Sequence, residues 1–250
     1  MRAGGALASE VARAERALHR RTALACGVAE HAGVPGRFRV WERAGVLAAV
    51  ATDPALGFLA TVSGVTRETV PAAIALLDAP VWAGVKPAIV VSAEFAELPA
   101  AGLVRARDRL LAVKRLEPRP VATPPEAIDV DVFVSVLLAG FGAHGVVTRF
   151  MAAEHRAPAI RRFLAVAEEV PIAAAGMTIH GDVAVLGAAS TLPAHRGHGA
   201  QRELLHRRLD AAASAGCTLA VATARPDSAS AVNLSRTGFD LHRRTAWRRP

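Results

Sequence analysis

The chain has 250 residues, of which 52% are hydrophobic and 21% are charged. This composition can bury a core, which excludes an intrinsically disordered protein, and the length allows one large domain or two. Arg, Glu or Pro interrupts every apolar run before it reaches the roughly 20 residues that a membrane-spanning helix needs. We therefore expect a globular protein without a membrane partner.

The formal net charge of +8 comes almost entirely from arginine, because lysine occurs only at Lys86 and Lys114. Alanine makes up about a fifth of the chain, and high Arg and Ala usage follows from GC-rich coding DNA. Only 4% of the residues are aromatic, which leaves few rings for stacking on bases. We therefore do not expect a nucleic-acid partner, although an anionic cofactor can use part of the positive charge.

The first 21 residues carry two glutamates and five arginines among their alanines, so they lack the apolar stretch of a secretory signal. This predicts a cytoplasmic protein. Cys26 and Cys217 lie far apart in the sequence and form no CxxC pair. The pattern predicts two buried thiols and neither a disulfide framework nor a metal site.

The first half of the chain predicts an α/β order of elements. An Ala-, Arg- and Glu-rich helix is expected within residues 1–35, where a Gly-Pro break ends it. Short apolar runs predict strands, a helical period follows them, and further β-type runs complete the half. In chain order these segments are 38–41, 46–51, 58–62 (strands), 70–77 (helix), 88–91 and 103–116.

Four prolines between Glu117 and Pro125 cannot continue a helix or a central strand, so the predicted domains are 1–118 and 119–250. In the second domain, short connections predict an antiparallel meander of three strands after two helices. The helices are expected over 128–141 and 147–160, and the strands over 163–167, 172–179 and 183–191. Both halves share a strand-helix-strand plan, so the first is a candidate degenerate repeat of the second.

The most informative segment runs from Thr191 to Gln201, between the last meander strand and a helical run over 202–216. Glycines in such a turn let the backbone approach a ligand, its N–H groups point outward, and the helix N-terminus adds partial positive charge. The segment therefore predicts a phosphate or pyrophosphate site, to which Arg196 adds a permanent cation. The assigned residues are Thr191, Leu192, Arg196, Gly197, His198, Gly199, Ala200 and Gln201.

A metal site is not expected in this turn. His195 and His198 are three residues apart, but no third or fourth ligand is nearby in the sequence.

At this point the sequence resembles the GCN5-related N-acetyltransferase (GNAT) superfamily, whose pyrophosphate loop reads Arg/Gln-x-x-Gly-x-Gly/Ala. Arg196 and Gly199 match this pattern, whereas Gln201 stands where the last small residue is usual. A further strand is expected over 217–223. The segment 228–239, which ends in Gly-Phe, resembles the second family signature, and a last strand is expected over 241–247. The resemblance covers about residues 120–247. It implies an α/β (α+β) fold with a mixed, mostly antiparallel central sheet flanked by helices.

The resemblance also implies acetyl-CoA as co-substrate. Its pantetheine arm would pair with the strand 183–191, an N–H near Leu192 would polarise the acetyl carbonyl, and Asn233 would lie near the pantetheine arm or the thiol. The family often uses a tyrosine acid before the Gly-Phe, but this chain has no tyrosine and carries Leu234 there.

No catalytic side chain is assigned from the sequence. Ser230, Ser235 or water could protonate the thiolate. The candidate general bases, obtained only by elimination, are Glu154, Glu168, Glu169 and His180.

These observations predict an acetyl-CoA-dependent N-acetyltransferase that transfers an acetyl group to a small-molecule or peptide amine by direct attack on the thioester. The alternative is a non-catalytic acyl-CoA-binding or sensing module, which the missing tyrosine and the divergent first half favour. A basic nucleic-acid-associated protein is the third hypothesis. The sequence leaves open the acceptor, the role of the first half, and whether the protein is a monomer or a homodimer.

Overall fold

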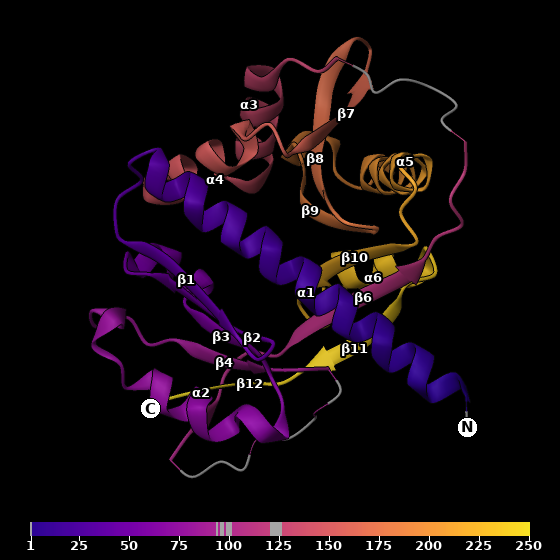
Figure 1. The fold of residues 1–250 in the computed structure, drawn as a ribbon. Coiled ribbons are helices and arrows are strands. Elements are labelled where there is room, and N and C mark those ends of the chain that lie inside the picture. Colours follow the sequence, from indigo (N-terminus) through magenta and orange to yellow (C-terminus); the bar gives the residue numbers. More distant parts are fainter. Residues whose placement is uncertain (1, 94, 96–97, 99–101, 121–126) are drawn as a thin grey trace. The chain divides into compact units, whose positions relative to one another are not determined.

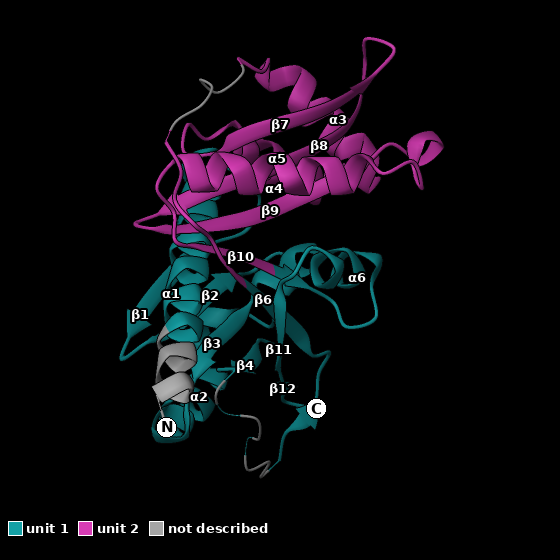
Figure 2. Cartoon of the chain, turned by 90° about the vertical axis from the view of Figure 1, so that its right-hand side faces the viewer, with its two compact units in different colours: residues 1–113, 223–250 teal, residues 114–222 magenta. Residues whose placement is uncertain are grey.

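The computed structural model describes residues 2–93, 95, 98, 102–120 and 127–250, so part of the predicted boundary at 117–125 lies outside the described residues. The chain forms two compact units (Figure 2). Unit 1 contains residues 1–113 and 223–250, and unit 2 contains residues 114–222. Packing thus joins the last 28 residues to the first half, while the division of the sequence at 118/119 stays a prediction.

Unit 1 contains a six-stranded sheet in the order β1-β2-β3-β4-β12-β5, in which β3 and β4 are parallel and their neighbours antiparallel. Two further strands of this unit, β6 and β11, pair antiparallel. The elements (Figure 1) are α1 (Arg2–His31), β1 (Phe38–Arg43), β2 (Val46–Ala51), β3 (Thr61–Val65), α2 (Val70–Leu77), β4 (Ala88–Val91), β5 (Val104–Arg105), β6 (Arg109–Arg115), α6 (Ala229–Arg236), β11 (Asp240–Arg244) and β12 (Ala246–Arg248).

Three predicted β segments of unit 1 differ from the structure, and one of them, 103–116, is divided into β5 and β6. The strand expected over 58–62 starts only at Thr61, because Pro54–Leu59 forms a 3-10 helix. Asp53 caps that helix by accepting the Ala55 N–H at 2.9 Å, and Pro54 suits its first turn. The strand expected over 241–247 is divided into β11 and β12, which pair with β6 and β4 respectively.

Unit 2 contains the predicted antiparallel meander. Strands β7, β8 and β9 pair antiparallel in that order, and β10 then pairs parallel to β9. This confirms the mixed, mostly antiparallel sheet. The elements are α3 (Val130–Phe141), α4 (Gly145–Arg156), β7 (Arg161–Ala167), β8 (Val170–His180), β9 (Val183–Thr191), α5 (Ala200–Ser214) and β10 (Leu219–Ala224).

Helices α3 and α5 cover opposite faces of this sheet. Ala173 and Ala175 of β8 pack with Leu204 of α5, whereas Ala174 packs with Leu137 of α3. Successive strand side chains point to opposite faces, so this alternation places one helix on each face. The sheet of unit 2 is therefore buried on both sides.

The same order of elements occurs in both units. In each, a meander of three antiparallel strands is followed by a helix and by a strand parallel to the third one: β1-β2-β3-α2-β4 in unit 1 and β7-β8-β9-α5-β10 in unit 2. An irregularity with positive φ interrupts the third strand of each, at Gly64 (φ 75°) and Ala188 (φ 43°). The first half therefore fits the expected degenerate repeat.

Within unit 2, α3 approaches β9 closely at Gly140. A Cβ at this position would lie 2.5 Å from Ser190 Oγ, 2.8 Å from Ser190 Cβ and 3.1 Å from the Thr191 nitrogen. Ser190 is itself buried, and its hydroxyl donates to the Leu137 carbonyl at 2.9 Å. The absence of a side chain at residue 140 thus sets the distance between helix and strand.

We predict that Gly140→Ala destabilises the protein. The overpacking should cost about 1–3 kcal/mol, and the better helix propensity of alanine should return at most about 1 kcal/mol. Thermal denaturation should show a melting temperature lower by a few degrees. Gly27→Ala in α1 is the matched control, because a Cβ there meets nothing within 4 Å, and it should not destabilise. A Gly140→Ala protein as stable as the parent would contradict the close contact.

A buried polar cluster lies in unit 1. The Glu15 carboxylate, 7% exposed, accepts the Ser92 hydroxyl at 2.8 Å and the Ala93 N–H at 3.0 Å. His19 Nε2 lies 3.0 Å from Ser63 Oγ. Burial, together with the Arg244 cation, lowers the pKa of His19 from 6.5 to about 4. The folded protein therefore holds this imidazole neutral.

This shift predicts a loss of stability between pH 6.5 and pH 4. In that range the unfolded chain protonates His19 while the folded protein does not, so the free energy of unfolding falls as the pH falls; below about pH 4 both states bind the proton and the loss levels off. The total loss should be about 3 kcal/mol. Urea denaturation at several pH values measures it.

His19→Gln should be less stable at pH 7 but should lose less stability on acidification than the parent. Equal pH dependence in the two proteins would show that His19 does not titrate as stated.

Candidate functional site

The parallel pairing of β9 with β10 covers only the first part of β9. Residues 183–186 lie opposite 219–222, and the register ends there although β9 continues to Thr191. Among the described residues, no strand pairs with this edge over 187–191. The backbone along this edge can therefore pair with an extended ligand, as an added strand would.

A β-bulge bends β9 where this open edge begins. Gly187 lies opposite Gly176 and Ala189 opposite Ala175, so Ala188 is an extra residue without a partner in the register. Its φ of 43° is unusual for a residue with a side chain. Bulges redirect strands and often lie next to active sites.

The backbone N–H groups at the end of β9 point in alternating directions. The Leu192 N–H donates to the Ile172 carbonyl at 2.9 Å, so the sheet already uses it. Because successive N–H groups of a strand point to opposite edges, the Thr191 N–H faces the open edge. An N–H near Leu192 was expected to face the ligand. The Leu192 N–H faces β8, whereas the neighbouring Thr191 N–H has the direction that this role requires.

The turn between β9 and α5 has the geometry of an anion site. Gly197 (φ 84°) and Gly199 (φ 86°) adopt the left-handed conformation, and a Cβ on either would meet nothing within 4 Å. Among the described residues, the backbone N–H groups of 197–201 form no hydrogen bond, and no side chain caps α5 at Gly199. Exposed N–H donors at the N-terminus of a 15-residue helix are suited to a phosphate.

Both ends of this turn are tied to Thr191. The Gln201 Nε2 donates to Thr191 Oγ1 at 2.8 Å, and the Arg196 Nε donates to the Thr191 carbonyl at 3.3 Å. The Arg196 Nη2 also donates to the Gly140 carbonyl, at 2.9 Å, in the last turn of α3. Arg196 thus braces the turn, in that its hydrogen bonds hold the turn against β9 and α3, and it also adds positive charge. Gln201, which departs from the family pattern, holds the other end of the turn through its hydrogen bond to Thr191.

The structure places the remaining predicted residues as follows. His198 is exposed in the turn, and Ala200 is buried at the start of α5. Asn233 is half-buried on α6, which belongs to unit 1, whereas Thr191 belongs to unit 2. The described residues contain no group of three or more His, Cys, Asp or Glu placed to hold a metal ion.

The positions of Leu234 and of three candidate bases can be compared with the roles considered for them. Leu234 is 4% exposed, so its side chain belongs to the core. Glu168 and Glu169 form the turn between β7 and β8, with φ of 50° and 66°. His180 Nε2 lies 3.1 Å from Thr178 Oγ1 at the end of β8. None of these contacts identifies a general acid or base.

Sequence reasoning missed the contact between Gly140 and Ser190, the bulge at Ala188 and the bracing role of Arg196. The first is a contact between residues fifty positions apart, and no local pattern indicates it. Ala188 lies in a run of small residues that reads as an uninterrupted strand. Neither the contact at Gly140 nor the bulge at Ala188 had a signal in the sequence.

Comparison with known families gives the class of the protein. Residues 138–239 match the family model of the acetyltransferase (GNAT) family, and this segment contains β9, the turn and α5. Residues 138–239 thus form a GNAT acetyltransferase domain, and the general chemistry of that family is acyl transfer. A comparison with curated proteins found no match.

Solved structures share the fold over most of the chain. A GCN5-related N-acetyltransferase from Kribbella flavida has a TM-score of 0.62 at 18% identity, covering 89% of this chain and 95% of that chain. One from Sphaerobacter thermophilus has a TM-score of 0.55 at 13% identity, covering 82% and 81%. A GNAT-family acetyltransferase from Colwellia psychrerythraea has a TM-score of 0.53 at 14% identity, covering 85% of each chain. At such identities the likeness shows the fold alone.

Two further observations concern the predictions about the cysteines and the membrane. Cys26 and Cys217 are both buried cysteines in the thiol form, as expected. Among the described residues, no helix combines the length and the apolar character needed to cross a bilayer.

The bracing role of Arg196 leads to a prediction about coenzyme A binding. Arg196→Ala removes both a cation and the contacts to Thr191 and Gly140, so the dissociation constant for coenzyme A should rise about tenfold to a hundredfold. Arg196→Lys keeps the charge but not the planar guanidinium group, so its dissociation constant should lie between those of the parent and of Arg196→Ala. Isothermal titration calorimetry measures these constants.

Arg119→Ala is the matched control in the same unit, because the Arg119 side chain is exposed and pairs with the exposed Asp210 at 3.5 Å. It should bind coenzyme A like the parent. If Arg196→Ala also bound coenzyme A like the parent, the contacts of Arg196 would not contribute to coenzyme A binding.

Proposed function

We propose that the protein transfers an acetyl group from acetyl-CoA to an amine of a small molecule or peptide. The observation that carries this proposal is the meeting of two features at Thr191: the open edge of β9 and the turn with exposed N–H donors. One suits an extended amide-bearing arm, and the other suits a pyrophosphate. A coenzyme A thioester contains both groups.

The residues of the turn and strand have distinct roles in this proposal. Arg196 and the N–H groups of 197–201 would hold the pyrophosphate, and the edge of β9 over 187–191 would hold the pantetheine amides. The Thr191 N–H would face the thioester carbonyl, where a backbone donor stabilises developing negative charge. Asn233 would contact the pantetheine arm. When bound, acetyl-CoA supplies an activated acyl group on a thiol leaving group.

Protons would be exchanged without a tyrosine. As the bond from the amine nitrogen to the acetyl carbon forms and the carbon–sulfur bond breaks, the amine proton leaves to water and the thiolate takes one up. Ser230 and Ser235 are exposed on α6, whereas Leu234 is buried, so a hydroxyl at the family's usual position has no counterpart here. A thiol has a pKa of about 8.5, so its thiolate leaves readily, and water suffices.

A non-catalytic acyl-CoA-binding module is the second candidate. The described contacts of Glu168, Glu169 and His180 identify no base, and the buried Leu234 supplies no acid. Binding without turnover would be compatible with this arrangement. The two candidates share the turn and differ only in whether free thiol is released.

The test is a variant that closes the turn. Arg196→Ala with Gly199→Glu adds a side chain and a negative charge where the N–H donors face outward, so acetyl-CoA should no longer raise the melting temperature. Release of free thiol with a panel of amines should be lost in the same variant. A protein with Arg20→Ala and Gly84→Glu is the matched control, since Arg20 is exposed in α1 and Gly84, like Gly199, has a positive φ and no atom within 4 Å of a Cβ.

Stabilisation by acetyl-CoA without thiol release from any amine would favour the binding module. If acetyl-CoA stabilised neither the parent nor the control, both candidates would be wrong.

A further inference from the structure

A cavity of about 560 Å³ lies in unit 1, between two segments far apart in the sequence. The segment 105–108 joins β5 to β6, and the segment 225–228 joins β10 to α6. Arg243 of β11 completes the lining. All of these residues belong to unit 1, so the cavity is a feature of that unit alone.

Charged side chains dominate the lining of this cavity. The other lining residues, Ala106, Pro226 and Ser228, are small, so the surface offers little to an apolar ligand. Four arginines and two aspartates give the lining a formal net charge of +2. The charged residues are Arg105, Arg107, Asp108, Arg225, Asp227 and Arg243.

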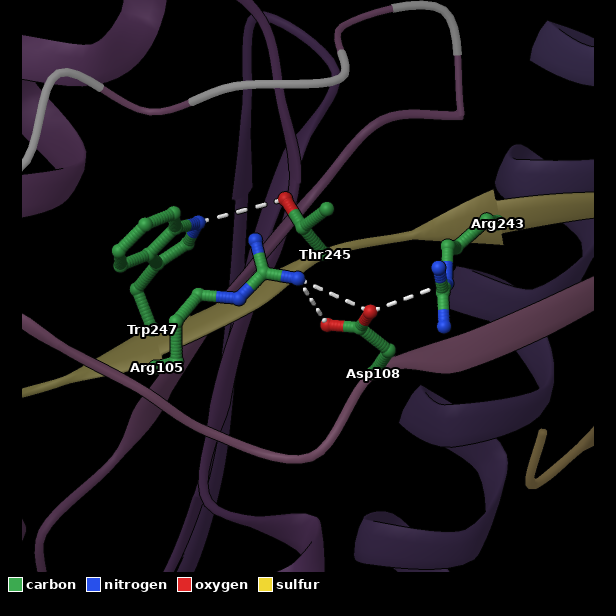
Figure 3. A network of polar contacts seen from close by, with 5 residues as sticks. All are labelled: Arg105, Asp108, Arg243, Thr245 and Trp247. Atoms are coloured by element: carbon green, nitrogen blue, oxygen red, sulfur yellow. Dashed lines mark hydrogen bonds and ion pairs between the residues drawn. The ribbon is translucent and has the colours of Figure 1, made fainter.

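Two of the arginines are held in place by one carboxylate (Figure 3). The Arg105 Nη2 donates to both oxygens of Asp108, at 2.8 and 2.9 Å, and the Arg243 Nε lies 3.1 Å from Asp108 Oδ2. The Asp108 side chain is only 11% exposed, whereas those of Arg105 and Arg243 are 47% and 67% exposed. The carboxylate thus orders both guanidinium groups and leaves much of each accessible.

The position of Arg105 is fixed a second time by an aromatic ring. Its guanidinium carbon lies 4.7 Å from the centre of the Trp247 ring, a cation–π contact. The Trp247 Nε1 in turn donates to Thr245 Oγ1 at 3.3 Å. An arginine held on two sides loses little side-chain entropy when it binds an anion.

All four arginines keep donors for a ligand. Within the part of the chain that the structure describes, Nε and Nη1 of Arg105 and both Nη groups of Arg243 form no hydrogen bond. Arg107 and Arg225 add one cation from each segment. Among the described residues, their side chains form no ion pair or hydrogen bond, and both residues are exposed. Planar guanidinium donors match the oxygens of an anion.

Asp227 is the carboxylate that opposes a bound anion. It is exposed and directly precedes Ser228, the N-cap residue of α6, whose hydroxyl accepts the Ala231 N–H at 3.2 Å. The partial positive charge at a helix N-terminus interacts favourably with a nearby carboxylate, so α6 compensates part of the charge of Asp227. Even with Asp227 counted in full, the arginines of the lining outnumber its carboxylates by two.

A net charge of +2 is best matched by a dianion. A phosphomonoester carries a charge of about −1.5 to −2 at pH 7, and its three terminal oxygens can accept hydrogen bonds from several guanidinium groups at once. A single carboxylate has half that charge and two oxygens. We propose that this cavity binds the phosphomonoester group of a small ligand. The proposal does not rest on the proposed function, because it concerns binding to unit 1 and no step of the acyl transfer.

Isothermal titration calorimetry with glycerol 3-phosphate as the probe tests this, in a slightly alkaline buffer free of phosphate. Glycerol 3-phosphate should bind, whereas glycerol and acetate should bind far more weakly. Arg107→Gln with Arg225→Gln should raise the dissociation constant of the probe about tenfold to a hundredfold. Arg20→Gln with Arg43→Gln is the matched control, because it removes the same charge from exposed positions of unit 1 outside the cavity, and it should bind like the parent.

Asp227→Asn should change the affinity in the opposite direction. It removes the negative charge that opposes the anion, so the dissociation constant should fall about fivefold, the effect of one unit charge near a solvated anion. A merely structural effect of substitutions in this loop would weaken binding in both variants.

The phosphomonoester can come from a free phosphorylated ligand or from the 3′-phosphate of coenzyme A. The titration is therefore repeated with the protein saturated with coenzyme A or with 3′-dephospho-coenzyme A. Unchanged binding in both supports a site for a free ligand, and binding lost with coenzyme A alone supports a site for its 3′-phosphate.

Three results would overturn the proposal. They are no binding of glycerol 3-phosphate to the parent, equal binding to the parent and to the Arg107 and Arg225 double variant, and binding lost with both forms of coenzyme A. In the last case the probe would compete for the site of the pyrophosphate and not for the cavity.

Discussion

The candidate site depends on how Thr191 is held. Its hydroxyl accepts Gln201 and its carbonyl accepts Arg196, so the residues before and after the two glycines are tied to one point at the end of β9. In this arrangement the backbone N–H groups of 197–201 form no hydrogen bond among the described residues. Preorganised donors bind an anion without the cost of ordering a loop. Arg196 extends this support to α3 through the Gly140 carbonyl.

The repeat in unit 1 shows what the same plan looks like without such a site. There the turn after β3 is closed by its own side chains: Thr69 Oγ1 accepts the Thr66 N–H at 2.9 Å, and the Thr66 hydroxyl donates to Glu68 at 2.7 Å. The Glu68 carboxylate at the start of the following helical segment interacts favourably with the helix dipole, but its negative charge would repel a phosphate. The segment 66–69 between β3 and α2 contains no glycine, whereas the corresponding turn of unit 2 contains Gly197 and Gly199.

Local patterns in the sequence were sufficient for elements whose signal is local. The strands over 46–51, 88–91 and 183–191 have the predicted bounds, because each is a short apolar run between turn residues. The division of the last strand at Thr245 was not predictable, since it depends on which distant strand each part pairs with. For the same reason the turn could be located from its glycines, while the hydrogen bond from Arg196 to the Gly140 carbonyl, between residues 56 positions apart, could not be predicted.

The net charge of +8 overstates the charge available to a partner, because many arginines serve the backbone. Arg162 donates to the His155 and Ala157 carbonyls, Arg207 donates to that of Leu164, and the buried Arg208 donates to that of Leu204. Burial lowers the pKa of Arg208 to about 10, which still leaves it charged at neutral pH. A guanidinium has five donors and no acceptor, so it can satisfy several carbonyls at once. The positive charge that remains for an anionic partner is therefore a local property of the few places that expose unpaired donors or guanidinium groups, and not of the whole surface.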